Sequence, residues 1–100
     1  MNILDRHRQE IKKLCEGNNV KYLYSFGSVN TPRFNKESDI DLLVDFSVDD
    51  PLEYADSYFA VKFALEKMLN HPVDLLENKA LKNPFLKESI DKSKVLIYGA

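Results

Sequence analysis

Three aspartates stand where their carboxylates could bind divalent metal ions. Asp39 and Asp41 are two residues apart in a strand-forming segment, and Asp74 interrupts a second apolar segment at 73–76. Because side chains alternate along a strand, Asp39 and Asp41 are expected to share one face. Two carboxylates this close repel each other unless a cation lies between them. Mg²⁺ binds carboxylate oxygens and commonly adds substrate phosphate oxygens, so the pattern favours a metal site.

The position of Asp74 decides how many metal ions such a site could hold. If its segment pairs beside the one that carries Asp39 and Asp41, on the same face, three carboxylates converge. Three carboxylates can hold two metal ions roughly 3.5–4 Å apart, which stabilises the attacking and leaving oxygens of an in-line displacement. Asp45 shares the same strand face, but it lies near the strand end and is interpreted as peripheral.

A glycine–serine pair precedes the aspartates by ten residues. Gly27 and Ser28 directly follow a strand-forming segment at 20–26. Glycine lets the backbone turn sharply and approach a ligand closely. Backbone N–H groups at such a turn form an anion site, to which the Ser28 hydroxyl adds a donor. A turn that binds phosphates, combined with acids that bind metal, outlines a nucleotidyl-transfer site.

The elements that must position these groups follow from the hydrophobic pattern. Strands are predicted at 20–26, 40–46, 73–77 and 94–98, where β-branched, aromatic and leucine residues cluster. Helices are predicted at 3–16, from Pro51 to about Asn70, and from Pro84 to about Asp91. Asn2, Asp50 and Asn83 are the expected caps. The order predicts an α/β (α+β) fold, with a mixed sheet of about four strands and helices packed against one face.

The sequence motif resembles the minimal nucleotidyltransferases of the DNA polymerase β superfamily. The match rests on Gly27-Ser28-x10-Asp39-x-Asp41 with the later strand residue Asp74. The resemblance implies that Gly27 and Ser28 bind phosphates, that Asp39 and Asp41 bind both of two Mg²⁺ ions, and that Asp74 binds one and is the candidate base. These three aspartates are then the catalytic residues.

One stretch departs from the family pattern. Relatives often carry a basic residue and a glycine shortly after the Gly-Ser pair, whereas this chain has Thr31 and Pro32 there. Arg33 is the candidate replacement for the phosphate-binding charge, with Lys36 as an alternative. The departure leaves open how active the site is.

The resemblance also implies a reaction and a partner. It suggests Mg²⁺-dependent transfer of AMP from ATP to an acceptor hydroxyl on a partner protein. Stand-alone members of the family are often antitoxins, whose partner is a helical HEPN-type protein. The wide apolar surface of the second predicted helix, which includes Phe59 and Phe63, is expected to meet another chain in part. The alternative is a weakly active or inactive nucleotide-binding module that neutralises a helical partner by contact. A homo-oligomer also stays open.

The composition and charge of the chain argue against several other kinds of protein. The 100 residues fit one domain, 1–100, with 44% hydrophobic residues and a net charge of −2. Eight acids and no lysine or arginine lie between Glu37 and Asp56, which argues against direct nucleic-acid binding. The N-terminus does not resemble a signal peptide, and no apolar run reaches the roughly 18 residues that span a bilayer. The single cysteine, Cys15, excludes an intramolecular disulfide and fits a reducing cytoplasm.

Overall fold

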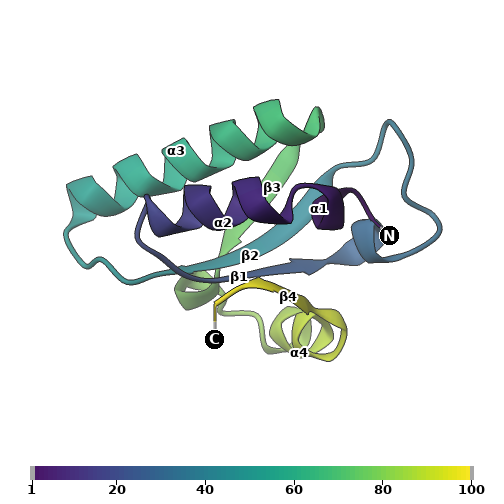
Figure 1. Cartoon of the computed structure of the whole chain (residues 1–100). Coiled ribbons are helices and arrows are strands. Elements are labelled where there is room, and N and C mark those ends of the chain that lie inside the picture. The colour runs from purple at the N-terminus through teal and green to yellow at the C-terminus, as the bar shows by residue number, and fades with distance from the viewer. Residues whose placement is uncertain (1, 100) are drawn as a thin grey trace.

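The computed structural model, which describes residues 2–99, is built on one four-stranded sheet (Figure 1). The strand order is β3-β2-β1-β4. Strand β1 runs antiparallel to both β2 and β4, whereas β2 and β3 are parallel, so the predicted mixed sheet is confirmed. The first three strands match their predicted bounds, and the fourth begins one residue later. The strands are β1 (Val20–Phe26), β2 (Ile40–Phe46), β3 (Val73–Glu77) and β4 (Val95–Tyr98).

The N-terminal helical region is broken where one continuous helix was predicted. It forms α1 (Ile3–Arg6) and α2 (Arg8–Glu16). His7 lies between them with φ −114° and ψ 18°, and its N–H donates to the carbonyl oxygen of Leu4, three residues back. The prediction of a helix over 3–16 was therefore wrong at this residue. Asn2 caps α1 as expected, because its side chain accepts hydrogen bonds from the N–H groups of Leu4 and Asp5.

The longest helix connects the two parallel strands. Helix α3 (Pro51–Leu69) begins after Asp50, whose carboxylate accepts a 3.0 Å hydrogen bond from the Glu53 N–H. It ends at Asn70, which adopts a left-handed conformation with φ 54°. A parallel strand pair needs such a long crossover, so α3 is what allows β3 to lie beside β2.

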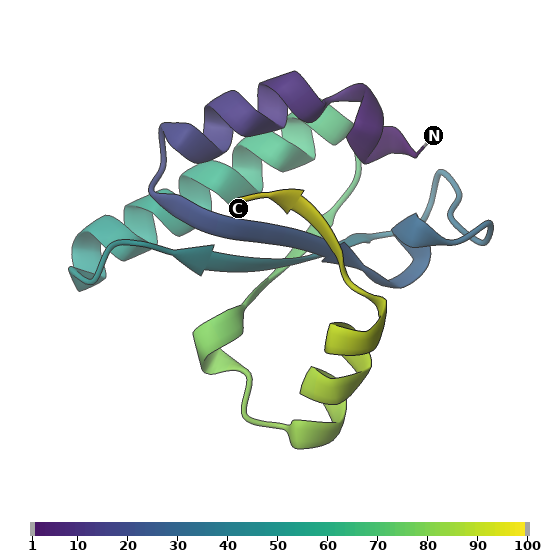
Figure 2. The same ribbon diagram turned by 60° about the horizontal axis from the view of Figure 1, so that its bottom comes forward.

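The helices lie on both sides of the sheet. Helices α1, α2 and α3 cover one face, whereas α4 (Pro84–Ser93) lies on the other side (Figures 1 and 2). The prediction that helices pack against one face therefore fails for α4. Two short 3₁₀ turns complete the fold, η1 (Gly27–Asn30) after β1 and η2 (Asn78–Ala80) after β3. Across residues 2–99, none of the helices has the length and apolarity that a membrane crossing requires.

The hydrophobic core lies between the sheet and the first three helices. Alternate residues of β2 and β3 point into it, together with one apolar side of α2 and α3. Burying these side chains is the main favourable term in folding, at roughly 25 cal/mol per Å² of apolar surface. The most deeply buried members are Leu4, Ile11, Cys15, Leu23, Ile40, Leu42, Val61 and Leu65.

The buried thiol of Cys15 is expected to be unreactive in the folded chain. The residue is 0% exposed, and burial, together with the negative charge of Glu16, raises its pKa to about 12. Only the thiolate reacts with disulfide reagents. Labelling with Ellman's reagent at pH 8 should therefore be slow until guanidinium chloride unfolds the chain. Stability should fall as pH rises above about 9, because the unfolded thiol ionises first. Rapid labelling without denaturant would contradict this placement.

Candidate active site

The parallel pairing of β2 and β3 places two of the predicted aspartates side by side. Asp41 and Asp74 are direct partners in the register of these strands. Their neighbours on each strand, Ile40 and Val73, are also paired and are buried in the helix-side core. Because side chains alternate, Asp41 and Asp74 lie on the opposite face of the sheet, away from α1, α2 and α3. The expectation that these two carboxylates share a face is met.

Asp39 completes the acidic group from the loop just before β2. It is exposed and stands two residues before Asp41, which is partly buried. Partial burial raises the pKa of Asp41, and the charges of Asp74 and Asp39 raise it further. The three carboxylates thus share one electrostatic environment, in which a bound cation would favour the ionised form of Asp41.

The carboxylates are not yet arranged as metal ligands. Across residues 2–99, no three Asp, Glu, His or Cys side chains are grouped so that they could hold a metal ion together. Their chemistry nevertheless fits a hard divalent cation, because all three offer carboxylate oxygens, with Asp41 and Asp74 on one face of the sheet and Asp39 close enough to raise the pKa of Asp41. The paired backbones of β2 and β3 already bring Asp41 and Asp74 together.

Gly27 brings the turn after β1 against the Asp41 carboxylate. Phe26 at the end of β1 pairs with Asp41 on β2, so the turn begins beside this aspartate. Gly27 adopts φ +75°, which side chains with a Cβ rarely tolerate. A Cβ at this position would also lie 2.6 Å from Oδ2 of Asp41. The backbone conformation thus favours glycine here, and a Cβ would displace the Asp41 carboxylate.

Thr31 stabilises the turn at Gly27–Asn30 through its hydrogen bonds. In the sequence, this residue stands out only as a departure from the family pattern. The carbonyl oxygen of Ser28 accepts two hydrogen bonds from Thr31, one from its N–H and one from its Oγ1, both at 2.9 Å. Oγ1 also accepts a 3.2 Å bond from the Arg33 N–H. Threonine side chains commonly hydrogen-bond to a backbone carbonyl three or four residues earlier in the chain. The spacing of Thr31 after Ser28 could therefore have indicated that it stabilises the turn.

Removing the Thr31 hydroxyl should loosen the turn. In Thr31→Val the backbone bond to Ser28 remains, but both bonds of the hydroxyl, to the Ser28 carbonyl and from the Arg33 N–H, are lost. Each such bond typically contributes about 0.5–1.5 kcal/mol. Roughly two- to tenfold weaker ATP binding is expected by isothermal titration calorimetry. Thr31→Ser keeps the hydroxyl and should bind as the wild type does. Equal affinity in the valine and wild-type chains would show that Thr31 does not shape the phosphate turn.

The two candidate phosphate-binding cations differ in their surroundings. Arg33 is exposed in the loop after η1, and within residues 2–99 its side chain makes no hydrogen bond or ion pair. Lys36 instead lines a cavity beside α1. Roles for Arg33 and Lys36 at the phosphates stay predictions.

The glycine turn after β1, Asp41 on β2 and its partner Asp74 on the parallel strand β3 form the arrangement expected of a nucleotidyltransferase. A family model described as polymerase beta, nucleotidyltransferase matches residues 9–100, so the chain belongs to this family. Two curated relatives from Methanocaldococcus jannaschii are named as candidate protein adenylyltransferases. They are 30% and 33% identical to this chain, and each alignment covers 95% of the chain and 91% of the relative.

Several solved structures have a similar fold. One described as a minimal nucleotidyltransferase is 29% identical, with a TM-score of 0.76 and 95% coverage of both chains. A toxin–antitoxin structure with AMP-PNP has a TM-score of 0.71 at 22% identity, covering 93% of this chain and 73% of the other. A Shewanella oneidensis complex of a tri-AMPylated HEPN toxin with its antitoxin has a TM-score of 0.66 at 20% identity, covering 97% and 73%. The chain is thus similar in fold to a minimal nucleotidyltransferase and to the antitoxin type of toxin–antitoxin complex.

Proposed function

We propose that this chain transfers AMP from ATP to a hydroxyl of a helical partner protein, as the antitoxin of a toxin–antitoxin pair. The observation that carries the proposal is the pairing of Asp41 with Asp74, with Gly27 packed against the Asp41 carboxylate. The names of the curated relatives support the protein acceptor, and the toxin–antitoxin neighbours support the partner.

Asp39, Asp41 and Asp74 are the residues that would hold Mg²⁺. When bound, the cation neutralises charge on the transferring phosphoryl group. The turn at Gly27 and Ser28 holds the β- and γ-phosphates and fixes the α-phosphate in line with the acceptor. The acceptor oxygen forms a bond to the α-phosphorus as the bond to the bridging oxygen breaks, and pyrophosphate leaves. Asp74, which is exposed, accepts the hydroxyl proton.

Transfer can be tested with the chain, ATP, Mg²⁺ and the co-expressed product of the neighbouring gene. Intact-mass spectrometry should show AMP adducts on that partner, and EDTA should prevent them. The double variant Asp39→Asn/Asp41→Asn should yield none. An active double variant, or no adduct with the wild-type chain, would reject the transfer reaction.

The outer side of α3 is the proposed contact with the partner. Phe59 and Phe63 are 50% and 59% exposed, and their rings stack with centroids 5.7 Å apart. Leu52, on the same helix, is 78% exposed. Exposed apolar patches of this kind mark interaction surfaces. Phe59→Ser/Phe63→Ser should weaken the complex in size-exclusion chromatography, while Lys67→Ser on the same helix should not.

Neutralisation by contact alone is the competing function. It is favoured by Thr31 and Pro32 in the phosphate loop and by carboxylates that are not grouped as metal ligands. A growth assay with the partner toxin separates the two functions. Asp39→Asn/Asp41→Asn should fail to neutralise if AMP transfer is required, whereas Phe59→Ser/Phe63→Ser should fail under either function.

A further inference from the structure

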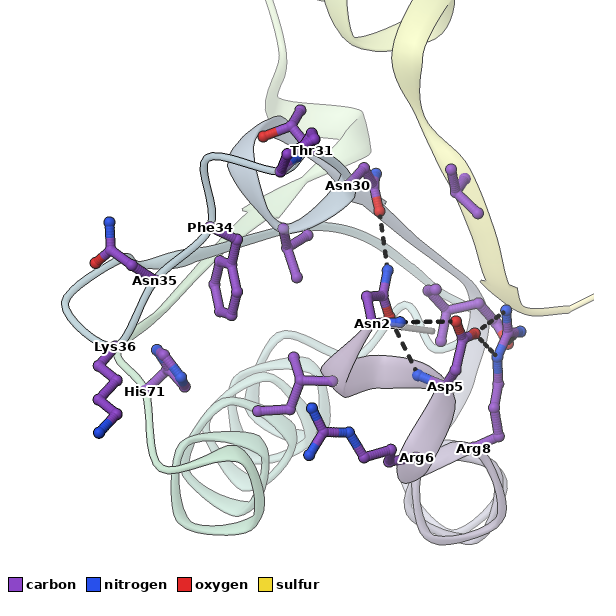
Figure 3. Close-up of a pocket in the computed structure, with 15 residues that line it drawn as sticks. Asn2, Asp5, Arg6, Arg8, Asn30, Thr31, Phe34, Asn35, Lys36 and His71 are labelled. Atoms are coloured by element: carbon purple, nitrogen blue, oxygen red, sulfur yellow. Dashed lines mark hydrogen bonds and ion pairs between the residues drawn. The ribbon is translucent and has the colours of Figure 1, made fainter.

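A cavity of about 990 Å³ lies where α1 meets the loop at 31–36 (Figure 3). It is bounded by α1, the loop at 31–36, His71 and β4, and none of the catalytic aspartates, Gly27 or Ser28 lines it. Its volume is at the upper end of the roughly 300–1,000 Å³ typical of small-molecule sites. The nucleotidyl-transfer reaction as described makes no use of this space.

The charge of the cavity is positive. Asp5 is the carboxylate among its lining residues, and its Oδ1 is already paired with Arg8, at 3.2 Å from Nε and 3.1 Å from Nη2. Arg6 and Lys36 also line the cavity, and within residues 2–99 neither side chain has a hydrogen bond or an ion pair. Two cations are therefore left without a counter-charge, which favours an anionic ligand.

The side-chain amide of Asn30, which lines the cavity, has an N–H donor without a hydrogen-bond partner. Oδ1 of Asn30 accepts hydrogen bonds from Ser25 Oγ at 3.0 Å and from Asn2 Nδ2 at 3.4 Å. The orientation of Asn2 is fixed, because its own Oδ1 caps α1, and this in turn fixes Asn30. Nδ2 of Asn30 is left buried without a partner. Such groups are rare in folded proteins and often mark a missing polar partner.

Two aromatic rings form the opposite wall. The rings of Phe34 and His71 lie 4.9 Å apart, and Figure 3 shows both facing the same hollow as Arg6. Nδ1 of His71 must donate its proton, because its 2.8 Å partner is the carbonyl oxygen of Ser38. Nε2 is then free to contact a ligand. Aromatic side chains at such a wall stack on nucleobases in a way that tolerates any base.

We propose that this cavity is a second nucleotide site, which binds a nucleoside monophosphate without a metal ion. The phosphate is held by Arg6, Lys36 adds positive charge at the edge of the cavity, and the base lies against Phe34 and His71. The site shares none of the three aspartates, Gly27 or Ser28 with the proposed transfer reaction, and it adjoins the turn η1 through Asn30 and Thr31.

The proposal is tested by titrating AMP, adenosine and inorganic phosphate into the full chain in EDTA, by isothermal titration calorimetry. AMP should bind saturably at one site per chain and more tightly than adenosine or phosphate. Arg6→Glu/Lys36→Glu should weaken AMP at least about tenfold. Phe34→Ala should weaken AMP while leaving phosphate binding unchanged. Lys13→Glu/Lys67→Glu, which makes the same charge change on exposed positions of α2 and α3, should bind as the wild type does.

Other results would overturn the proposal. It fails if AMP does not bind in EDTA, or if Arg6→Glu/Lys36→Glu binds normally. It also fails if phosphate alone binds as tightly as AMP. Loss of binding in Asp39→Asn/Asp41→Asn would assign the nucleotide to the active site instead. Circular dichroism of each variant establishes that it is folded, and both Arg6 and Lys36 are exposed enough to be replaced without loss of core packing.

Discussion

Replacing Asp41 by asparagine should abolish AMP transfer and, at neutral pH, make the folded chain more stable. The activity loss should exceed the roughly 10–100-fold that is typical of groups that only support a metal ligand. The stability gain follows because partial burial and the charges of Asp74 and Asp39 all disfavour the ionised carboxylate of Asp41. Asparagine keeps the shape of the side chain and removes that charge.

The stability effect has a defined pH dependence. The pKa of Asp41 in the folded chain lies above its ordinary value of 3.8, so the wild type loses stability as pH rises through this interval. The advantage of Asp41→Asn should therefore vanish below about pH 3.8 and be complete above the raised pKa. Urea unfolding at several pH values measures it. Asp45→Asn, on the same strand and face, is the matched control and should retain transfer activity. A less stable Asp41→Asn at pH 7 would mean that the three carboxylates do not repel one another.

Gly27→Ala should lose most transfer activity at a modest cost in stability. Alanine in the left-handed region costs roughly 1–2 kcal/mol of folding free energy. Each kcal/mol lowers the Tm of a domain of this size by about 4–8 °C. The new Cβ would meet Oδ2 of Asp41, the end of a side chain that can rotate away. The clash therefore displaces the carboxylate rather than the backbone, and catalysis suffers more than folding does.

A double-mutant cycle isolates that contact. In an Asp41→Ala background the clash is absent, so Gly27→Ala should cost less stability there, leaving only the backbone strain. Gly17→Ala is the matched control, because Gly17 has φ −82° and the nearest atom to its Cβ would be 3.5 Å away. It should be neutral or stabilise by roughly 0.4–1 kcal/mol. If Gly27→Ala retains full activity, the turn does not need to lie against the aspartate.

The strands and the central acids could be predicted from sequence because their signals are local. Segments such as 40–46 combine strand-forming residues with clear ends. That Asp39 shares a face with Asp41 stays a prediction, because Asp39 lies in the loop just before β2. The pairing of Asp41 with Asp74 was a conditional expectation, and the register confirms it. The roles of Arg33 and of the three aspartates in binding metal or phosphate stay predictions.

Other features depend on contacts that no local pattern encodes. The apolar spacing of 3–16 continues through His7, so the break between α1 and α2 could not be seen. The side on which α4 lies depends on how the chain crosses from β3 to β4. The cavity where α1 meets the loop at 31–36 joins residues such as Asn2, Asn30 and His71, which are distant in sequence and meet only through the sheet and its loops.

The weak attachment of α4 has a consequence for the dynamics of the domain. Ile90 is the one fully buried residue of this helix, whereas α3 buries four residues along its length. Opening α4 would give up the burial of little more than a single isoleucine, so the helix can unfold locally while the rest stays intact. Its backbone amides should exchange with deuterium long before those of α3, and proteases should cut the chain first at this helix.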